Sequence, residues 1–185
     1  YAQERMALIW GEAYGRDVVA MRFFNVYGPH QALSNPYTGV LAIFASRFLN
    51  NNRPLVNEDG KQRRDFVHVR DVARACRLAL QTSEAAGEVF NIGSGRHYSI
   101  LDIAEQMARV LGKEDIEPEI VGKCRVGDIR NCFADISHAQ KILGYQPRIT
   151  LEEGLAELAD WLEGQVAVDR MDDAVHELSL RGLAV

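Results

Sequence analysis

Apolar residues along the chain follow two spacings that alternate. Ala2, Met6, Ile9 and Ala13 recur at helical intervals, and they predict an amphipathic helix over residues 1–14 that ends at Gly15. Short continuous apolar runs that are rich in β-branched residues instead predict buried strands. These runs are 18–21, 66–69 and 89–92, with 119–121 as a further candidate.

Helical spacing returns between and after the predicted strands. Ser99 with Asp102, and Thr150 with Glu153, match capping boxes that begin two of these helices. Alternating strands and helices predict an α/β protein with a parallel sheet. Three or four strands are few for a complete doubly wound domain, so we expect this chain to be part of a longer protein. The predicted helices are 40–49, 70–82, 100–111, 136–143, 151–162 and about 168–180.

Composition narrows the class of protein. The chain has 185 residues, of which 47% are hydrophobic, an ordinary share for a globular protein. No apolar run approaches the ~18 residues of a membrane span, so no membrane partner is expected. A net charge of -5 argues against a nucleic-acid partner. The three cysteines form no C-x-x-C pair, which predicts no disulfide framework or zinc site and favours a cytoplasmic location.

Several common catalytic motifs are absent. Gly93 and Gly95 follow a predicted strand, but Tyr98 stands where a G-x-G-x-x-G fingerprint needs its third glycine. The chain also lacks a Walker A loop, an H-E-x-x-H helix and a G-x-S-x-G elbow. Motifs alone therefore indicate no complete catalytic unit.

Four local patterns occur together in a fixed order. They are R-F-F-N-V-Y-G-P at 22–29, R-D-F-V-H-V at 64–69, N-I-G-S-G at 91–95 and R-V-G-D-I-R at 125–130. In this order they resemble the extended short-chain dehydrogenase/reductase family, specifically its NAD-dependent nucleotide-sugar epimerases and dehydratases. The resemblance covers about residues 1–165. It is closest to UDP-glucose 4-epimerase-like members, and the stretch 58–65 and the tail lean toward dTDP-L-rhamnose 4-epimerase-like ones.

The resemblance implies a fold and a division of the chain. We expect part of a Rossmann sheet, which holds NAD, and the smaller α/β substrate-binding domain of such an enzyme. The family's catalytic Y-x-x-x-K pair is expected just upstream of Tyr1, so this chain should hold no catalytic residue and be inactive alone. The expected segments are 1–36 (end of the Rossmann domain), 37–64 (substrate domain), 65–97 (return to the Rossmann domain), 98–165 (substrate-binding domain) and 166–185 (C-terminal helix).

The resemblance also implies binding residues. Phe24 is expected near the nicotinamide, and Asn25 is expected to bond the substrate diphosphate. Two guanidinium groups suit a diphosphate because each can bind it in a bidentate way. The expected substrate-binding residues are Asn25, Gly39, Val40, Val56, Asn57, Arg64, Arg125 and Asp128, with no metal ligand.

Each assignment has a simpler alternative. Asn25 could only open a turn, the two arginines could form surface ion pairs with Asp65 and Asp128, and residues 54–57 could be an edge strand. His68 is expected to be a structural core histidine. Asp71 is expected to begin the helix that follows it.

The resulting hypothesis is an enzyme part. The intact protein is expected to be an NAD-dependent epimerase that acts at C4 of a UDP- or dTDP-hexose, as a homodimer. A 4,6-dehydratase or a decarboxylase of the same family stays open, because the residues that distinguish them would lie upstream. A non-catalytic module for nucleotide-sugar binding or assembly is the alternative from another class.

Overall fold

The computed structural model describes residues 1–32, 39–123, 127–162 and 180. The helix predicted over about 168–180 lies outside these residues, apart from Leu180. Within them, no helix combines the length and the apolar character that a bilayer crossing requires. The elements in chain order are α1 (Ala2–Tyr14), β1 (Ala20–Phe23), β2 (Asn25–Tyr27), α2 (Val40–Leu49), β3 (Leu55–Val56), β4 (Arg63–Arg64), β5 (Phe66–His68), α3 (Val69–Gln81), the 3-10 helix η1 (Ser83–Ala85), β6 (Val89–Ile92), β7 (Tyr98–Ser99), α4 (Ile100–Val110), β8 (Glu119–Ile120), β9 (Asn131–Cys132), α5 (Ser137–Leu143) and α6 (Leu151–Leu162).

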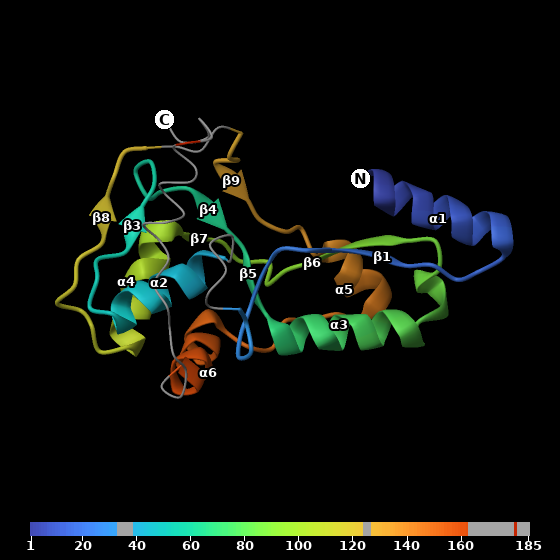
Figure 1. The fold of residues 1–185 in the computed structure, drawn as a ribbon. Coiled ribbons are helices and arrows are strands. Elements are labelled where there is room, and N and C mark those ends of the chain that lie inside the picture. Colours follow the sequence, from blue (N-terminus) through green and yellow to red (C-terminus); the bar gives the residue numbers. More distant parts are fainter. Residues whose placement is uncertain (33–38, 124–126, 163–179, 181–185) are drawn as a thin grey trace.

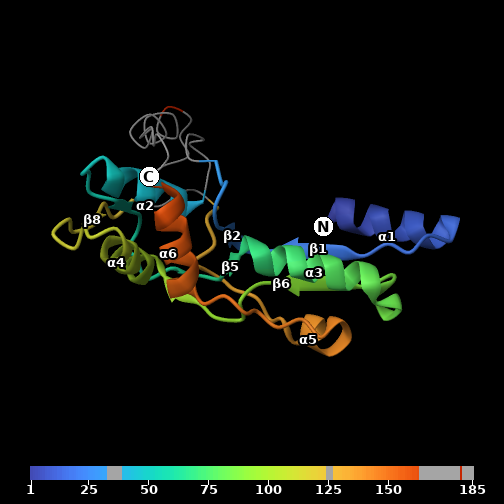
Figure 2. The same cartoon turned by 90° about the horizontal axis from the view of Figure 1, so that it is seen from below.

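The elements form two lobes that meet at β2 and β5. One lobe holds α1, β1, β6, α3 and α5, and the other holds α2, α4, α6 and the short strands β3 and β8 (Figures 1 and 2). Segments far apart in the sequence build each lobe, because the chain passes between them repeatedly. The residues where it crosses lie in the middle of the molecule.

The chain first crosses between the lobes in the extended segment from β1 to β2, and this segment changes its strand partner on the way. β1 pairs in parallel with β6, and β2 pairs in parallel with β5. Phe24 lies between the two: its N–H donates to the Ile92 carbonyl at 3.1 Å, and the Asn25 N–H donates to the Asp65 carbonyl at 3.0 Å. The partner therefore changes at Phe24–Asn25, and the predicted parallel pairing is present.

A first hydrophobic cluster lies under β6. α3 and α5 pack there, and the buried Tyr145 donates its hydroxyl to the Gly93 carbonyl at 2.9 Å. Burying side chains of this size contributes about 1.5–3 kcal/mol each. The cluster anchors the strand end that Gly93 follows. Its largest members are Phe90, Ile92, Ile136, Leu143 and Tyr145.

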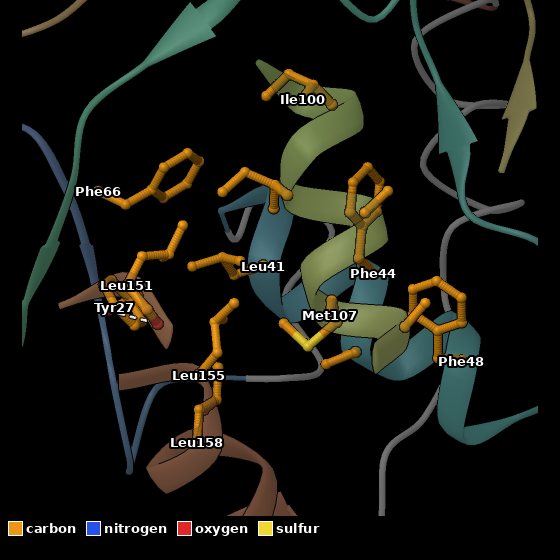
Figure 3. Close-up of a cluster of buried hydrophobic side chains, with 14 of the residues drawn as sticks. Tyr27, Leu41, Phe44, Phe48, Phe66, Ile100, Met107, Leu151, Leu155 and Leu158 are labelled. Atoms are coloured by element: carbon orange, nitrogen blue, oxygen red, sulfur yellow. Dashed lines mark hydrogen bonds between the residues drawn. The ribbon is translucent and has the colours of Figure 1, made fainter. Parts of the chain in front are cut away.

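A second cluster joins α2, α4 and α6. Phe44 and Phe48 of α2 meet Met107 of α4 and Leu155 of α6, all fully or almost fully buried (Figure 3). Tyr27 of β2 enters the same cluster, and its hydroxyl donates to the Leu151 carbonyl at 3.5 Å. Tyr27 thus links the strand segment to the beginning of α6.

The capping boxes predicted from the sequence are confirmed. Ser99 Oγ accepts the Asp102 N–H at 3.1 Å, and Asp102 Oδ2 accepts the Ser99 N–H at 2.9 Å. Thr150 and Glu153 make the equivalent pair of bonds at 3.3 and 2.8 Å. Each box satisfies backbone donors that a helix start leaves open.

The start of α3 differs from its prediction. The helix begins at Val69, and His68 is its N-cap: Nδ1 accepts the Arg70 N–H at 3.3 Å. Asp71 therefore does not begin the helix. Its buried carboxylate accepts the N–H groups of Arg148 and Ile149 at 3.0 and 3.1 Å, so it fastens the segment before α6.

Candidate functional site

The change of strand partner creates the setting for a binding site. In α/β sheets, ligands bind outside the carboxyl ends of parallel strands, where neighbouring strands diverge. Phe24 and Asn25 stand at this divergence, between β1 and β2. Both are half-buried, and Phe24 packs against the cluster under β6. The structure therefore brings these two predicted residues to the edge of the sheet at which α/β proteins bind ligands.

Asp65 is a residue whose role the sequence interpretation missed. Its side chain is fully buried, and Oδ1 accepts the N–H and the hydroxyl of Ser94, both at 2.7 Å. Oδ2 accepts the N–H groups of Gly95 and Ala134 at 3.1 and 3.3 Å. A surface ion pair is wrong for Asp65, because its carboxylate is fully buried and is bonded by these four donors.

Gly93 allows this arrangement. A Cβ there would lie 2.5 Å from Asp65 Oδ2 and 2.6 Å from the Ala134 Cβ. Any side chain would thus push the Asp65 carboxylate from its donors. The N-I-G-S-G pattern consequently serves close backbone approach at this point.

Arg64 and Asp128, both predicted to bind substrate, lie together. Arg64 is on β4, the central strand between β7 and β9. One nitrogen, Nη1, donates to the carbonyls of Arg63 and Arg130, both at 2.9 Å, and Nη2 reaches Asp128 Oδ1 at 3.2 Å. Two backbone carbonyls hold the guanidinium in this direction. The ion pair between Arg64 and Asp128, which the sequence offered as the simpler alternative, is therefore present.

Arg130 extends this charged network. Its guanidinium donates to Glu58 Oε2 at 2.7 Å and to Asp59 Oδ2 at 2.8 Å. The hydrogen bond from Arg130 lowers the pKa of Asp59 to about 2. The turn at 58–60 is thereby tied to the segment that carries Asp128, a link that sequence spacing did not reveal.

Val56 and Asn57 lie at a strand edge. β3 pairs in parallel with β8, and the Val56 carbonyl accepts the Val121 N–H at 3.0 Å. The other edge of β3 has no strand partner in the part of the chain that is described. The Asn57 carbonyl is already bonded by Gln62 Nε2 at 3.0 Å. The segment is thus an edge strand, and its open edge leaves backbone groups of Leu55 for a ligand.

Gly39 and Val40 begin α2. Gly39 is the N-cap, and its carbonyl accepts the Ala42 N–H at 3.0 Å. No side chain caps this helix start. The first N–H groups of a helix that starts in this way can bind an anion.

Two expectations fall outside what the structure describes. Arg125, the second predicted diphosphate ligand, lies in the segment 124–126, outside the described residues. The catalytic pair was expected upstream of Tyr1 and is not in this chain. Across the described ranges, no group of histidine, cysteine and carboxylate side chains could hold a metal ion.

His68 lies behind the site and is buried. Its ring meets Tyr27 edge to face at a centroid distance of 5.3 Å, and Nε2 lies 3.7 Å from Glu157 Oε2. Because Nδ1 accepts the Arg70 N–H, the neutral ring carries its proton on Nε2. Burial lowers the pKa of His68 from 6.5, although the Glu157 charge acts in the opposite direction.

The lowered pKa of His68 predicts a loss of stability in acid. The unfolded chain binds a proton near the ordinary pKa of ~6.5 while the folded chain does not, so stability falls as the pH drops through this value. His68→Asn keeps a capping acceptor but cannot titrate. Urea unfolding at about pH 7.5 and about pH 5.5 should show a smaller acid loss for this variant than for the wild type. Equal losses would contradict the assignment.

Similarity to known proteins shows the family of this chain. The chain belongs to the NAD dependent epimerase/dehydratase family, whose model matches residues 1–93. A dTDP-L-rhamnose 4-epimerase from Burkholderia thailandensis is 40% identical over 162 residues, which cover 87% of this chain and 44% of that protein. A dTDP-glucose 4,6-dehydratase from Streptomyces niveus is 31% identical over 161 residues, which cover 86% of this chain and 46% of that protein.

A solved structure supports the fold class. The UDP-glucose 4-epimerase of Thermotoga maritima, solved with UDP-glucose, matches this chain with a TM-score of 0.82 and 34% sequence identity. The match covers 88% of this chain and 51% of that structure. The predicted class, part of a Rossmann-type sheet with a smaller α/β lobe, is confirmed. The chain spans about half the length of the curated relatives it matches.

Proposed function

We propose that the protein carrying this chain is an NAD-dependent epimerase that inverts C4 of a UDP- or dTDP-hexose. The observation that carries the proposal is Arg64, a guanidinium that two backbone carbonyls fix and that meets an anionic partner beside the strand divergence. Arginine so held suits a diphosphate, which presents paired anionic oxygens. The family to which the chain belongs uses NAD.

The residues of this chain would hold the nucleotide sugar at several points. Arg64 and Arg125 would bond the diphosphate, with Asp128 orienting Arg64. Asn25 would donate its amide to the same diphosphate, and the start of α2 would offer N–H groups. Within the segment 54–57, the backbone groups of Leu55 at the open edge of β3 would pair with the base.

The site also fits one end of a nicotinamide cofactor. Phe24 is a half-buried aromatic residue at the end of β1, where an apolar ring face suits a flat cofactor ring. NAD, when bound, supplies the oxidation and reduction of the sugar. Phe24 would hold the nicotinamide while Asn25 and Arg64 orient the sugar nucleotide. Segments 1–36 and 65–97 would then serve the cofactor, and 37–64 and 98–165 the substrate.

A dehydratase remains the second candidate. The relative from Streptomyces niveus supports it, because a 4,6-dehydratase shares the same half-chain at 31% identity. The higher identity to a 4-epimerase favours epimerisation. A module that binds nucleotide sugars without catalysis would show binding but no turnover.

Calorimetry tests the binding step. UDP-glucose and dTDP-glucose, titrated into the protein that carries this chain, should bind saturably, and glucose 1-phosphate should bind much more weakly. The difference arises because glucose 1-phosphate lacks the base and one of the two phosphates. The absence of heat from both nucleotide sugars at millimolar concentration would refute the proposed substrate class.

We further propose that the protein is a cytoplasmic homodimer that uses α1 at its interface. Met6, Ile9 and Trp10 on α1 are 70%, 56% and 53% exposed, an apolar surface that water disfavours. Light scattering should give twice the mass of one copy of the protein that carries this chain. Trp10→Glu should shift the protein toward monomer. A wild-type monomer would contradict the proposed dimer.

A further inference from the structure

Asp65 lies between two of the proposed substrate ligands. It follows Arg64 in the chain, and its own carbonyl accepts the Asn25 N–H at 3.0 Å. The Asp65 backbone is thus hydrogen-bonded to Asn25 and covalently linked to Arg64. Any shift of Asp65 would move both Arg64 and Asn25.

The Asp65 carboxylate fixes this point from the other side. It accepts four donors from two separate segments, Ser94–Gly95 after β6 and Ala134 after β9. β9 also pairs with β4, which carries Arg64. The side chain is fully buried, and only polar donors satisfy its oxygens. It therefore joins the end of the β1–β6 pair to the small sheet that presents Arg64.

From this geometry we propose that Asp65 is a positioning residue for the nucleotide-sugar site. It holds Arg64 and Asn25 in register with the loop 93–95 at the carboxyl end of β6. The inference rests on the proposed function, since the ligands it positions are those of a nucleotide diphosphate. It adds a residue that touches no substrate yet sets affinity for it.

Asparagine is the informative replacement. Asp65→Asn keeps the shape, but one oxygen becomes an NH₂ group that donates and cannot accept. Whichever way the amide turns, at least one backbone N–H group then faces the NH₂ group: that of Ser94 in one orientation, those of Gly95 and Ala134 in the other. The Ser94–Gly95 loop and Ala134 can no longer all stay in place, so Arg64 and Asn25 should shift.

Asp71→Asn is a control at a second buried carboxylate. Asp71 accepts two backbone N–H groups, those of Arg148 and Ile149, and pairs with Arg74, but it contacts none of the proposed ligands. Both variants should lose stability. A merely structural role for Asp65 would make the two behave alike in binding.

The test measures two quantities in each variant: the dissociation constant for the nucleotide sugar and the rate of backbone hydrogen exchange. The affinity is measured well below the melting temperature of each variant, with UDP-glucose or dTDP-glucose, whichever the wild type prefers. Asp65→Asn should weaken this binding at least about tenfold. Asp71→Asn should stay within about twofold of the wild type. Hydrogen exchange at the amides of Ser94, Gly95 and Ala134 should accelerate only in Asp65→Asn.

The outcomes separate the inference from the proposed function. If the wild type binds a nucleotide sugar and Asp65→Asn binds it equally well, the positioning role is wrong and the function stands. If the wild type binds neither sugar, the proposed function fails and the inference with it. Should Asp65→Asn not fold, Ser94→Ala removes a single bond to the carboxylate and should still weaken binding about threefold, and unchanged affinity would overturn the role.

Discussion

Gly154→Ala is expected to destabilise the protein by about 1–2 kcal/mol. A Cβ on Gly154 of α6 would overlap the Tyr27 hydroxyl and would lie 2.8 Å from Tyr27 Cζ and 2.9 Å from His68 Cδ2. Tyr27 and His68 are both buried, so neither ring can move aside freely. Overpacking of this kind costs about 1–3 kcal/mol, which outweighs the helix propensity of up to ~1 kcal/mol that alanine gains over glycine.

Chemical denaturation measures this effect, and a second substitution tests its cause. In a Tyr27→Phe background the hydroxyl is gone, so the same Gly154→Ala change should cost less. Ala156→Gly, at an exposed position of the same helix, reports helix propensity alone and should cost about 1 kcal/mol. A Gly154→Ala protein more stable than the wild type would show that packing against Tyr27 is loose.

Arg64→Ala is expected to weaken nucleotide-sugar binding at least about tenfold, or about 1.4 kcal/mol. The side chain is only 14% exposed, and its backbone bonds fix its direction before the substrate arrives. A diphosphate would therefore bind without the cost of ordering a free arginine. The sequence predicts a loss of the same size for Arg125→Ala.

Calorimetry with the tighter-binding nucleotide sugar gives the comparison. Arg109→Ala removes an equal charge from α4, where the side chain is 69% exposed and pairs only loosely with Glu105 at 3.9 Å. This control should leave the affinity unchanged within about twofold. If Arg64→Ala and Arg109→Ala bind alike, Arg64 is not a diphosphate ligand.

Much of the fold follows from local pattern. Apolar spacing predicted α1, α2, α4 and α6, and the pairs Ser99–Asp102 and Thr150–Glu153 predicted two helix starts, because these signals are contained within a few residues. Element ends were less accurate. β1 begins at Ala20 and not at Val18, because the Val18 carbonyl accepts the Gly87 N–H outside the ladder and its side chain packs on Gly11.

The site shows where sequence reasoning stops. Arg64 and Asp128 came from motifs in separate segments, and the structure places them together. Asp65 was missed because it adjoins Arg64, and successive residues of an extended chain face opposite sides. One side chain is therefore partly open and the other is buried. The Arg130 bonds to Glu58 and Asp59 span over 70 residues, which no local pattern predicts.

The most direct test of the account is turnover at C4. The protein that carries this chain, incubated with NAD and with UDP-glucose or dTDP-glucose, should be followed by proton NMR of the sugar. The account predicts a mixture of C4 epimers with the nucleotide intact and no net accumulation of NADH. Appearance of a 4-keto-6-deoxy sugar would identify a dehydratase instead. Nucleotide-sugar binding without any change in the sugar would contradict the proposed activity.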